Sequence, residues 1–272
     1  MPSPFTPPLD ATELEAALPR MRVVRTLGVG GQGVAVEADV DGIGRAALKV
    51  YGTQTVAHRV EREIDKLRRL ESGHVVRLYD HGEVSLRGEL CRFAVMEFVE
   101  GEETSALVGN LDDGSVDGEV RRLLLDIATG IDDLWALRVV HRDIKPANVM
   151  RRADGSYVVL DLGLAKHLGE PTLTQLGYTC GTLGYMSPEQ AAARRGLTLR
   201  SDLFALGILA YEVASGAHPF VRRQELVGRI PVRPLRDVRP AVSIEVSNVV
   251  ARLLQPTPLA RPSRDEIVAQ LV

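Results

Sequence analysis

The sequence predicts an α+β fold with a small β-rich N-terminal lobe and a larger, mainly helical C-terminal lobe. Three observations predict it. Short β-prone runs broken by glycines fill residues 23–50, and another run lies at 93–99. Beyond Gly101, apolar residues recur at helical spacing. A nearly all-apolar stretch at 203–214 is typical of a helix that is buried on every side. We place the lobes at residues 21–100 and 101–272.

Residues 1–20 are expected to be a tail with a short helix. The first nine residues, MPSPFTPPL, are rich in proline and predict an extended or disordered segment. Asp10 and Glu13 have the spacing of a capping box, in which each residue satisfies a backbone N–H of the other. This pattern predicts a helix that runs to Leu18.

Composition excludes several classes of function. The chain has 272 residues, of which 45% are hydrophobic, and a formal net charge of −3, which lacks the basic field of a nucleic-acid-binding domain. No apolar run approaches the roughly 18 residues that span a bilayer. The two cysteines, Cys91 and Cys180, suit a reducing compartment. We therefore expect a soluble, cytoplasmic protein with no membrane or nucleic-acid partner.

Lysine is rare in this chain. Only four of the 33 basic residues are lysines, at positions 49, 66, 145 and 166. Arginine is the default cation, a bias that suggests a bacterial source. Each lysine therefore indicates a position where a compact ammonium group is specifically needed.

Three glycines in the N-terminal lobe suggest contact with phosphates. Gly28, Gly30 and Gly33 read G-x-G-x-x-G between two β-prone runs. Because glycine has no side chain, the backbone at these positions could approach phosphates closely and offer N–H donors to them. A glycine-rich hairpin without a ligand explains the same pattern equally well. A dinucleotide-binding fold is disfavoured, because a strand and not a helix follows.

A helix is expected after these strands, with an apolar stripe at Val60, Ile64 and Leu67. Glu63 lies within the stripe, where a carboxylate is costly to bury unless it is paired. Lys49, in a β-prone run, is the cation available to it. We predict a Lys49–Glu63 salt bridge, and the alternative is that Glu63 lies at the edge of the stripe in water.

The strongest signal is the run H-R-D-I-K-P-A-N at 141–148, followed by a β-prone run at 157–160 and by D-L-G at 161–163. These residue types suit phosphoryl transfer, which needs cations on the phosphates, oxygen ligands for a metal, and a carboxylate near the attacking hydroxyl. Here the chain resembles the eukaryotic-type (Hanks-type) Ser/Thr protein kinase family, with its bilobal protein-kinase-like fold. The resemblance runs from 22 to 271 and includes S-P-E at 187–189, S-D-L at 201–203 and Arg261.

The resemblance implies catalytic roles. Asp143 would accept the proton of the substrate hydroxyl, and Lys145 would neutralise the γ-phosphate of ATP. Lys49, held by Glu63, would contact the α- and β-phosphates. The implied ligands of magnesium, or of manganese in its place, are Asn148 and Asp161. The other residues implied to bind ATP are Leu27, Gly28, Gly30, Gly33, Ala35, Ala47, Met96, Glu97, Val99 and Met150. Backbone groups of Glu97 and Val99 are implied to hydrogen-bond the adenine base.

Structural and regulatory roles follow from the same resemblance. Glu189 and Arg261 would form a buried ion pair, and Asp202 would brace the loop at 141–143. Arg142 and Lys166 would receive a phosphate from the activation segment. The candidate phosphosites are Thr172, Thr174 and Thr179. The remaining residues with an implied structural role are His141, Leu162 and Thr182.

The implied function is an ATP- and magnesium-dependent kinase of serine or threonine in proteins, activated by autophosphorylation between associated copies. A nucleotide-binding pseudokinase scaffold is the main alternative, but such proteins normally lack a catalytic residue, and Lys49, Asp143, Asn148 and Asp161 are all present. A phosphotransferase acting on small molecules should lack the features at 187–189, 201–202 and Arg261.

Overall fold

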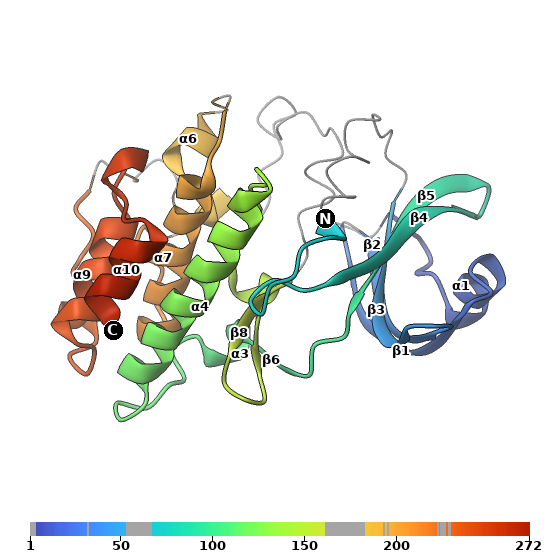
Figure 1. The fold of residues 1–272 in the computed structure, drawn as a ribbon, viewed down its shortest axis with the longest axis horizontal. Coiled ribbons are helices and arrows are strands. Elements are labelled where there is room, and N and C mark those ends of the chain that lie inside the picture. Colours follow the sequence, from blue (N-terminus) through green and yellow to red (C-terminus); the bar gives the residue numbers. More distant parts are fainter. Residues whose placement is uncertain are drawn as a thin grey trace. The chain divides into compact units, whose positions relative to one another are not determined.

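The computed structural model describes residues 4–31, 33–52, 67–160, 183–192, 194, 196–221, 223, 227 and 230–272. These residues form two compact units. The first contains the described residues up to Glu71 together with Val76–Val99, and the second contains Ser72–Val75 and the described residues from Glu100 on. Figure 1 shows their helices and strands.

The first unit is built on an antiparallel sheet of five strands in the order β1-β2-β3-β5-β4. Its strands are β1 (Met21–Gly30), β2 (Gly33–Val40), β3 (Gly44–Tyr51), β4 (Leu78–Leu86) and β5 (Glu89–Glu97). The sheet predicted from the runs at 23–50 and 93–99 is present, and β4 is a strand that the sequence pattern did not reveal.

The strand register divides the side chains of this sheet between two faces. Ala35 lies opposite Lys49 in β2–β3 pairing, and Ala47 lies opposite Met96 in β3–β5 pairing, so these four share one face. Their neighbours along each strand point to the other face and are buried in the core of the unit. The buried residues of that face include Val34, Val36, Leu48, Val50 and Val95.

The N-terminal segment is part of this core. Phe5 and Leu9 are buried in it, together with Leu14 and Leu18. The first nine residues were expected to be extended or disordered, but residues 4–9 are anchored because their two large apolar side chains cover the sheet. Helix α1 (Ala11–Ala17) contacts β1 and β4, which are the two edge strands. Helix α1 therefore connects the two edge strands of the sheet.

The capping box predicted for this helix is confirmed. The Glu13 N–H donates to Asp10 Oδ1 at 2.8 Å, and the Asp10 N–H donates to Glu13 Oε2 at 3.2 Å. Arg87, in the turn between β4 and β5, donates to the Glu13 carboxylate through Nε at 2.7 Å and through Nη2 at 2.7 Å. Arg87 Nη1 donates to the carbonyl of Pro7 at 2.6 Å. One arginine thus ties the hairpin to both the helix and the segment before it.

We expect Glu13→Gln to lower the melting temperature at pH 7 by about 1–3 °C. Glutamine keeps the capping box but loses the charge-assisted contact to Arg87. The hydrogen bond from Arg87 lowers the pKa of Glu13 from 4.5 to about 2. A lowered pKa in the folded state stabilises the fold above the unfolded value. The gap between variant and wild type should therefore shrink as the pH falls from 4.5 towards 2.

The matched control is Glu89→Gln, which removes an exposed carboxylate at the start of β5 on the same hairpin. Thermal melts of the three proteins across this pH range check the prediction. It is wrong if Glu13→Gln and Glu89→Gln melt alike at every pH.

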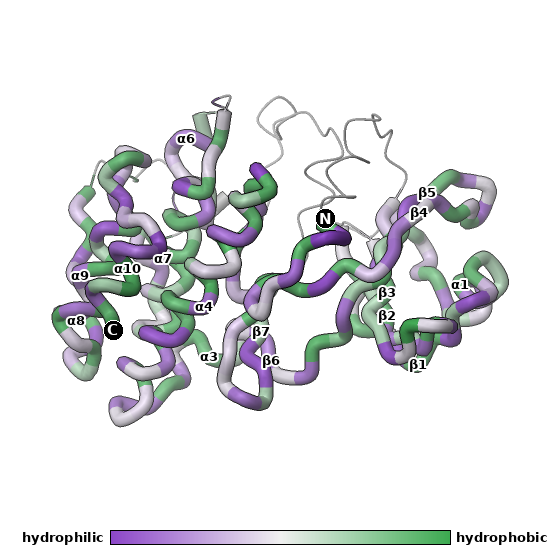
Figure 2. Tube along the Cα trace, viewed as in Figure 1, coloured by the Kyte–Doolittle hydropathy of each residue, from purple (hydrophilic) through white to green (hydrophobic). Residues whose placement is uncertain are grey.

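The second unit is mainly helical. Helix α4 (Val116–Ala136) packs against α7 (Leu199–Ser215), and α7 is buried at every position from Ser201 to Ala214, so the helix predicted to be buried on every side is confirmed. Figure 2 shows hydrophobic and hydrophilic residues interleaved along α4, as a helix with one buried face requires. Among the described residues of this unit, the other helices of more than one turn are α9 (Ile244–Leu253) and α10 (Arg264–Leu271).

Short elements complete this unit. Its strands are β6 (Gly101–Glu103), β7 (Val149–Arg152) and β8 (Tyr157–Val159), paired in that order. Its short helices are α3 (Thr104–Leu107), η1 (Pro146–Asn148), η3 (Leu183–Tyr185), α6 (Pro188–Ala191), α8 (Leu235–Val238) and η5 (Pro258–Ala260). Within the described ranges, no helix is both long enough and apolar enough to cross a membrane.

Candidate active site

Three polar residues of the H-R-D-I-K-P-A-N run meet in the loop between α4 and β7. Lys145 Nζ lies 2.9 Å from Asp143 Oδ2. Asn148 Nδ2 donates to the same oxygen at 2.9 Å and to the Asp143 carbonyl at 2.9 Å. Asp143 and Asn148 are buried, whereas Lys145 is half-buried. The structure thus brings together three of the predicted site residues.

This cluster contains the parts that phosphoryl transfer needs within one loop. Two donors on Oδ2 fix the orientation of the Asp143 carboxylate, which is a proton acceptor when ionised. Lys145 supplies a positive charge beside it. Because Asn148 Nδ2 donates to Asp143, the amide oxygen of Asn148 is the atom suited to a hard cation such as magnesium.

Asp202, at the start of α7, holds the loop in place. Its Oδ2 accepts the His141 N–H at 2.7 Å, and its Oδ1 accepts the Arg142 N–H at 2.8 Å. Burial raises the pKa of the Asp202 carboxyl, and the two backbone donors oppose that shift. Arg142 has a φ of 66°, in the left-handed region, so this contact also supports a backbone conformation that arginine rarely adopts.

His141 connects the same loop to the end of β8. Its Nδ1 accepts the Asp143 N–H at 3.3 Å, and its Nε2 lies 2.9 Å from the Leu160 carbonyl. A carbonyl only accepts, so Nε2 carries the proton and the ring is in one defined tautomer. His141 is fully buried, and its ring fixes the backbone N–H of Asp143.

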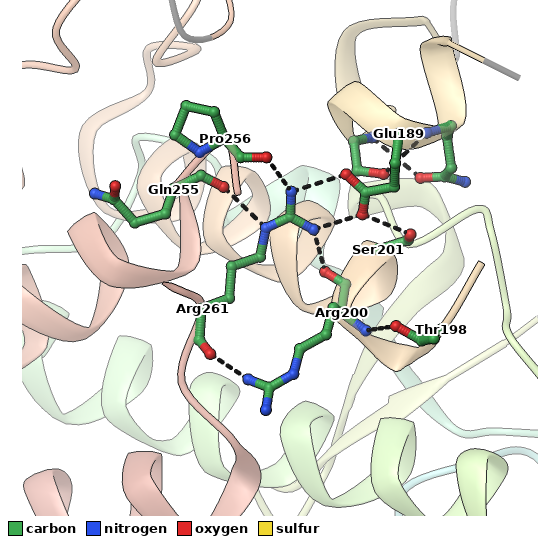
Figure 3. A network of polar contacts seen from close by, with 9 residues as sticks. Glu189, Thr198, Arg200, Ser201, Gln255, Pro256 and Arg261 are labelled. Carbon is green, nitrogen blue, oxygen red and sulfur yellow. Dashed lines mark hydrogen bonds and ion pairs between the residues drawn. The ribbon is translucent and has the colours of Figure 1, made fainter. Parts of the chain in front are cut away.

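Glu189 and Arg261 form a two-pronged ion pair, as Figure 3 shows. Arg261 Nη1 lies 2.6 Å from Oε1 and Nη2 lies 2.9 Å from Oε2. Ser201 Oγ donates to Glu189 Oε1 at 2.7 Å. Burial raises the pKa of Glu189, but the hydrogen bonds from Arg261 and Ser201 outweigh it, and the net shift is downward.

Arg261 is also held by carbonyl groups, which satisfy the rest of its guanidinium. It donates to the carbonyls of Gln255 at 2.9 Å, Pro256 at 3.1 Å and Arg200 at 2.6 Å. Its side chain has no exposed surface. A buried guanidinium whose N–H groups already have acceptors within the protein indicates a structural role and not a ligand-binding role.

The S-P-E pattern at 187–189 has a local explanation in helix α6. Ser187 Oγ accepts the Gln190 N–H at 3.3 Å, and Gln190 Oε1 accepts the Ser187 N–H at 3.1 Å, which makes a capping box. Pro188 occupies the first helical position, where no donor is needed. The turn of helix that follows carries Glu189 towards Arg261.

We expect Arg261→Met to lower the free energy of unfolding by about 3–5 kcal/mol, because Glu189 would remain as a buried charge without its partner. Arg261→Lys should recover little of this loss, since an ammonium cannot reproduce the two-pronged contact. Urea-induced unfolding followed by circular dichroism measures both values.

Arg264→Met is the matched control, because Arg264 forms an exposed ion pair with Asp265 at 3.0 Å. Arg264→Met should lower the free energy of unfolding by about 0.5 kcal/mol or less. Equal losses for Arg261→Met and Arg264→Met would show that the buried pair does not stabilise the fold.

In the first unit, the residues expected to contact ATP lie along one sheet face. Ala35, Ala47, Lys49 and Met96 share it, and Gly28 lies opposite Ala35 in β1–β2 pairing. Lys49 is half-buried, with Nζ 5.0 Å from the centre of the Tyr51 ring. The Glu97 N–H donates to the Arg77 carbonyl at 2.9 Å. Leu27 is exposed, and Val99 is buried.

The three glycines of the G-x-G-x-x-G run differ in what the fold requires of them. Gly33 has a φ of 145°, and a Cβ there would lie 1.9 Å from the Val50 carbonyl oxygen, so only glycine fits. A Cβ at Gly28 or Gly30 would meet no described atom within 4 Å. Packing of the described residues therefore explains Gly33 but not the other two.

Several predicted residues lie outside the described residues, and Met150 is in β7 of the second unit. The predicted Lys49–Glu63 salt bridge is among the interactions that the description does not reach. The predicted residues outside the described ranges are Glu63, Asp161, Leu162, Lys166, Thr172, Thr174, Thr179 and Thr182.

The structure also places residues in this region that the sequence pattern did not single out. Thr104, in α3, is buried and donates through Oγ1 to the Pro146 carbonyl at 2.8 Å, just before Asn148. Tyr185 donates to the buried carboxylate of Glu212 on α7. No local spacing signals either contact, because the partners are 42 and 27 residues apart in the chain.

Comparisons with known proteins show which proteins this chain is similar to. A family model described as a protein kinase domain matches residues 21–271. The serine/threonine-protein kinase pkn2 of Myxococcus xanthus is 35% identical over an alignment of 264 residues that covers 89% of this chain and 31% of that protein. The serine/threonine-protein kinase PknD of Mycobacterium tuberculosis is 33% identical over an alignment of 231 residues that covers 82% of this chain and 33% of that protein.

Among solved structures, the PknI kinase domain of Mycobacterium tuberculosis matches with a TM-score of 0.68 and 25% identity. The match covers 93% of this chain and 94% of that one, and it confirms the fold class predicted from the sequence. This chain spans about a third of the length of the curated relatives pkn2 and PknD.

Proposed function

Since this chain belongs to the protein kinase family, we propose that it transfers the γ-phosphoryl group of ATP, with magnesium, to serine or threonine hydroxyls of other proteins. The observation that carries the proposal is the cluster of Asp143, Lys145 and Asn148 in a loop braced by Asp202. The curated relatives named as serine/threonine-protein kinases support the same choice of acceptor. We also propose that it acts in the cytoplasm.

In the proposed reaction, Asp143 accepts the proton of the substrate hydroxyl as the hydroxyl oxygen bonds to the γ-phosphorus. The bond from that phosphorus to the β–γ bridging oxygen breaks, and ADP leaves. Lys145 offsets the negative charge on the transferred group. Asn148, with Asp161 from the sequence motif, would hold magnesium, which neutralises charge on the phosphates when bound.

The first unit supplies the nucleotide-binding part of the proposal. Lys49 is assigned to the α- and β-phosphates. The packing of the described residues does not require glycine at positions 28 and 30. We assign Gly28 and Gly30 to the part of the backbone that approaches those phosphates closely. Small residues at Ala35 and Ala47 leave room for a flat base against their face of the sheet.

We expect Asp143→Asn to reduce phosphate transfer by about 10²–10⁴-fold, because asparagine cannot accept the proton. The assay uses ATP labelled at the γ-phosphate, magnesium and a generic basic protein. Asp154→Asn is the matched control and should keep wild-type activity, since Asp154 is an exposed residue of the turn between β7 and β8.

Two outcomes would contradict the proposal. Wild-type protein that binds nucleotide without transferring phosphate would be a pseudokinase scaffold. Transfer to small molecules but to no protein would indicate a small-molecule phosphotransferase.

We also propose activation by autophosphorylation between associated copies. Thr172, Thr174 and Thr179 are the candidate acceptors in the sequence, with Arg142 and Lys166 as the cations that would receive the phosphate. Mass spectrometry of active protein should find a phosphate on at least one of these threonines, and none in the Asp143→Asn variant. Fully active protein without any phosphate between residues 161 and 189 would contradict the proposal.

A further inference from the structure

Four side chains of the first unit form a compact cluster at one end of the sheet. Arg25 in β1, Glu37 in β2 and Arg45 in β3 are linked by ion pairs: Glu37 Oε2 accepts Arg25 Nε at 2.7 Å, and Glu37 Oε1 accepts Arg45 Nε at 2.7 Å. The Arg45 guanidinium carbon lies 4.1 Å from the centre of the Phe98 ring, and that of Arg25 lies 6.0 Å from it.

The strand register places this cluster beside the segment assigned to the base of ATP. Glu37 lies opposite Ala47, and Ala47 lies opposite Met96. Ala46 lies opposite Glu97, the last residue of β5. Arg45 precedes Ala46, so continuing the same register brings it opposite the residue that follows β5. Phe98 is that residue, between Glu97 and Val99, whose backbone groups are expected to bind the base.

The charges within the cluster favour contact with the ring. Glu37 has only 6% of its side chain exposed, and its carboxylate is matched by two guanidinium groups. The hydrogen bond from Arg45 is the largest contribution that lowers the pKa of Glu37, burial opposes it, and Arg25 adds to it. The Arg45 guanidinium that binds Glu37 lies over the Phe98 ring, whose face carries partial negative charge.

The two arginines themselves are open to solvent, with 61% of the Arg25 side chain and 46% of the Arg45 side chain exposed. They therefore bury little surface of their own, and their guanidinium groups offset the charge of the buried Glu37 carboxylate. What the cluster does fix is the position of one aromatic ring on the segment that follows β5.

We propose that Arg45, oriented by Glu37 and assisted by Arg25, holds Phe98 and thereby positions the backbone of Glu97 and Val99 for nucleotide binding. These are positioning residues, because they act on the nucleotide through Phe98 and the backbone beside it. The proposal rests on the proposed function, since it concerns the affinity of the same site for ATP and ADP.

Phe98→Leu is the main test, because it removes the ring and leaves both ion pairs of Glu37 in place. A cation–π contact worth about 1 kcal/mol corresponds to about a fivefold change in affinity. We expect the variant to show about a fivefold higher KM for ATP and a fivefold higher Kd for ADP, with kcat changed less than twofold. Arg45→Met should give the same pattern, whereas Phe98→Tyr, which keeps the ring, should restore wild-type values.

Arg22→Met is the matched control, because it breaks the exposed ion pair of Arg22 with Asp39, at 2.6 Å, between the same two strands β1 and β2. It should leave the KM for ATP unchanged. In the double variant Arg45→Met/Phe98→Leu, the KM should rise no further than in either single variant, because both remove one shared contact. Independent effects would multiply to about 25-fold and would overturn the inference.

The inference and the proposed function fail in different ways. An active Phe98→Leu variant with an unchanged KM for ATP and a lower melting temperature would show that the cluster only stabilises the fold, and would overturn the inference alone. Wild-type protein that takes up neither magnesium-ATP nor ADP in calorimetry would overturn the proposed function, and the inference with it.

Discussion

The buried carboxylate of Asp202 is the contact on which the proposed catalytic loop depends. Burying an aspartate disfavours its charged form, and the cost is offset only if its oxygens receive hydrogen bonds. Here both oxygens receive backbone N–H groups from His141 and Arg142. The loop gains two fixed points, and His141 adds a third through the Leu160 carbonyl. The backbone of Asp143 is therefore fixed by the loop, and its carboxylate is oriented by Lys145 and Asn148.

Helix α7 explains why such a contact can exist. Its apolar positions are surrounded by other elements, so a polar residue in its first turn is carried into the interior together with the helix. Asp202 and Ser201 both lie in that turn, where a carboxylate also interacts favourably with the helix dipole. Asp202 holds the loop at 141–143, and Ser201 donates to Glu189 of the ion pair with Arg261. One buried helix thus supports both the loop at 141–143 and the ion pair of Glu189 with Arg261.

Local patterns in the sequence predicted what local interactions produce. The Asp10–Glu13 capping box, the buried helix at 203–214 and the proximity of residues 141–148 all depend on short spacings. Strand β4 was missed because polar residues and a glycine occupy its centre at 80–82, and its alternation of polar and apolar residues is confined to the last four positions, 83–86. The anchoring of Phe5 and Leu9, and the contact of Thr104 with Pro146, depend on partners far away in the chain, which spacing alone does not reveal.

Where the fold does not require a residue type, the chemistry of a ligand becomes the better explanation for it. Gly33 is required by its left-handed φ and by Val50, so it says nothing about phosphates. Gly28 and Gly30 have no such requirement among the described residues, although glycine is costly in a strand. The choice of lysine at position 145 also needs an explanation, because arginine supplies nearly every other cation of the chain. A compact ammonium beside Asp143 suits a phosphoryl group better than a broad guanidinium, and this preference links the composition of the sequence to the proposed reaction.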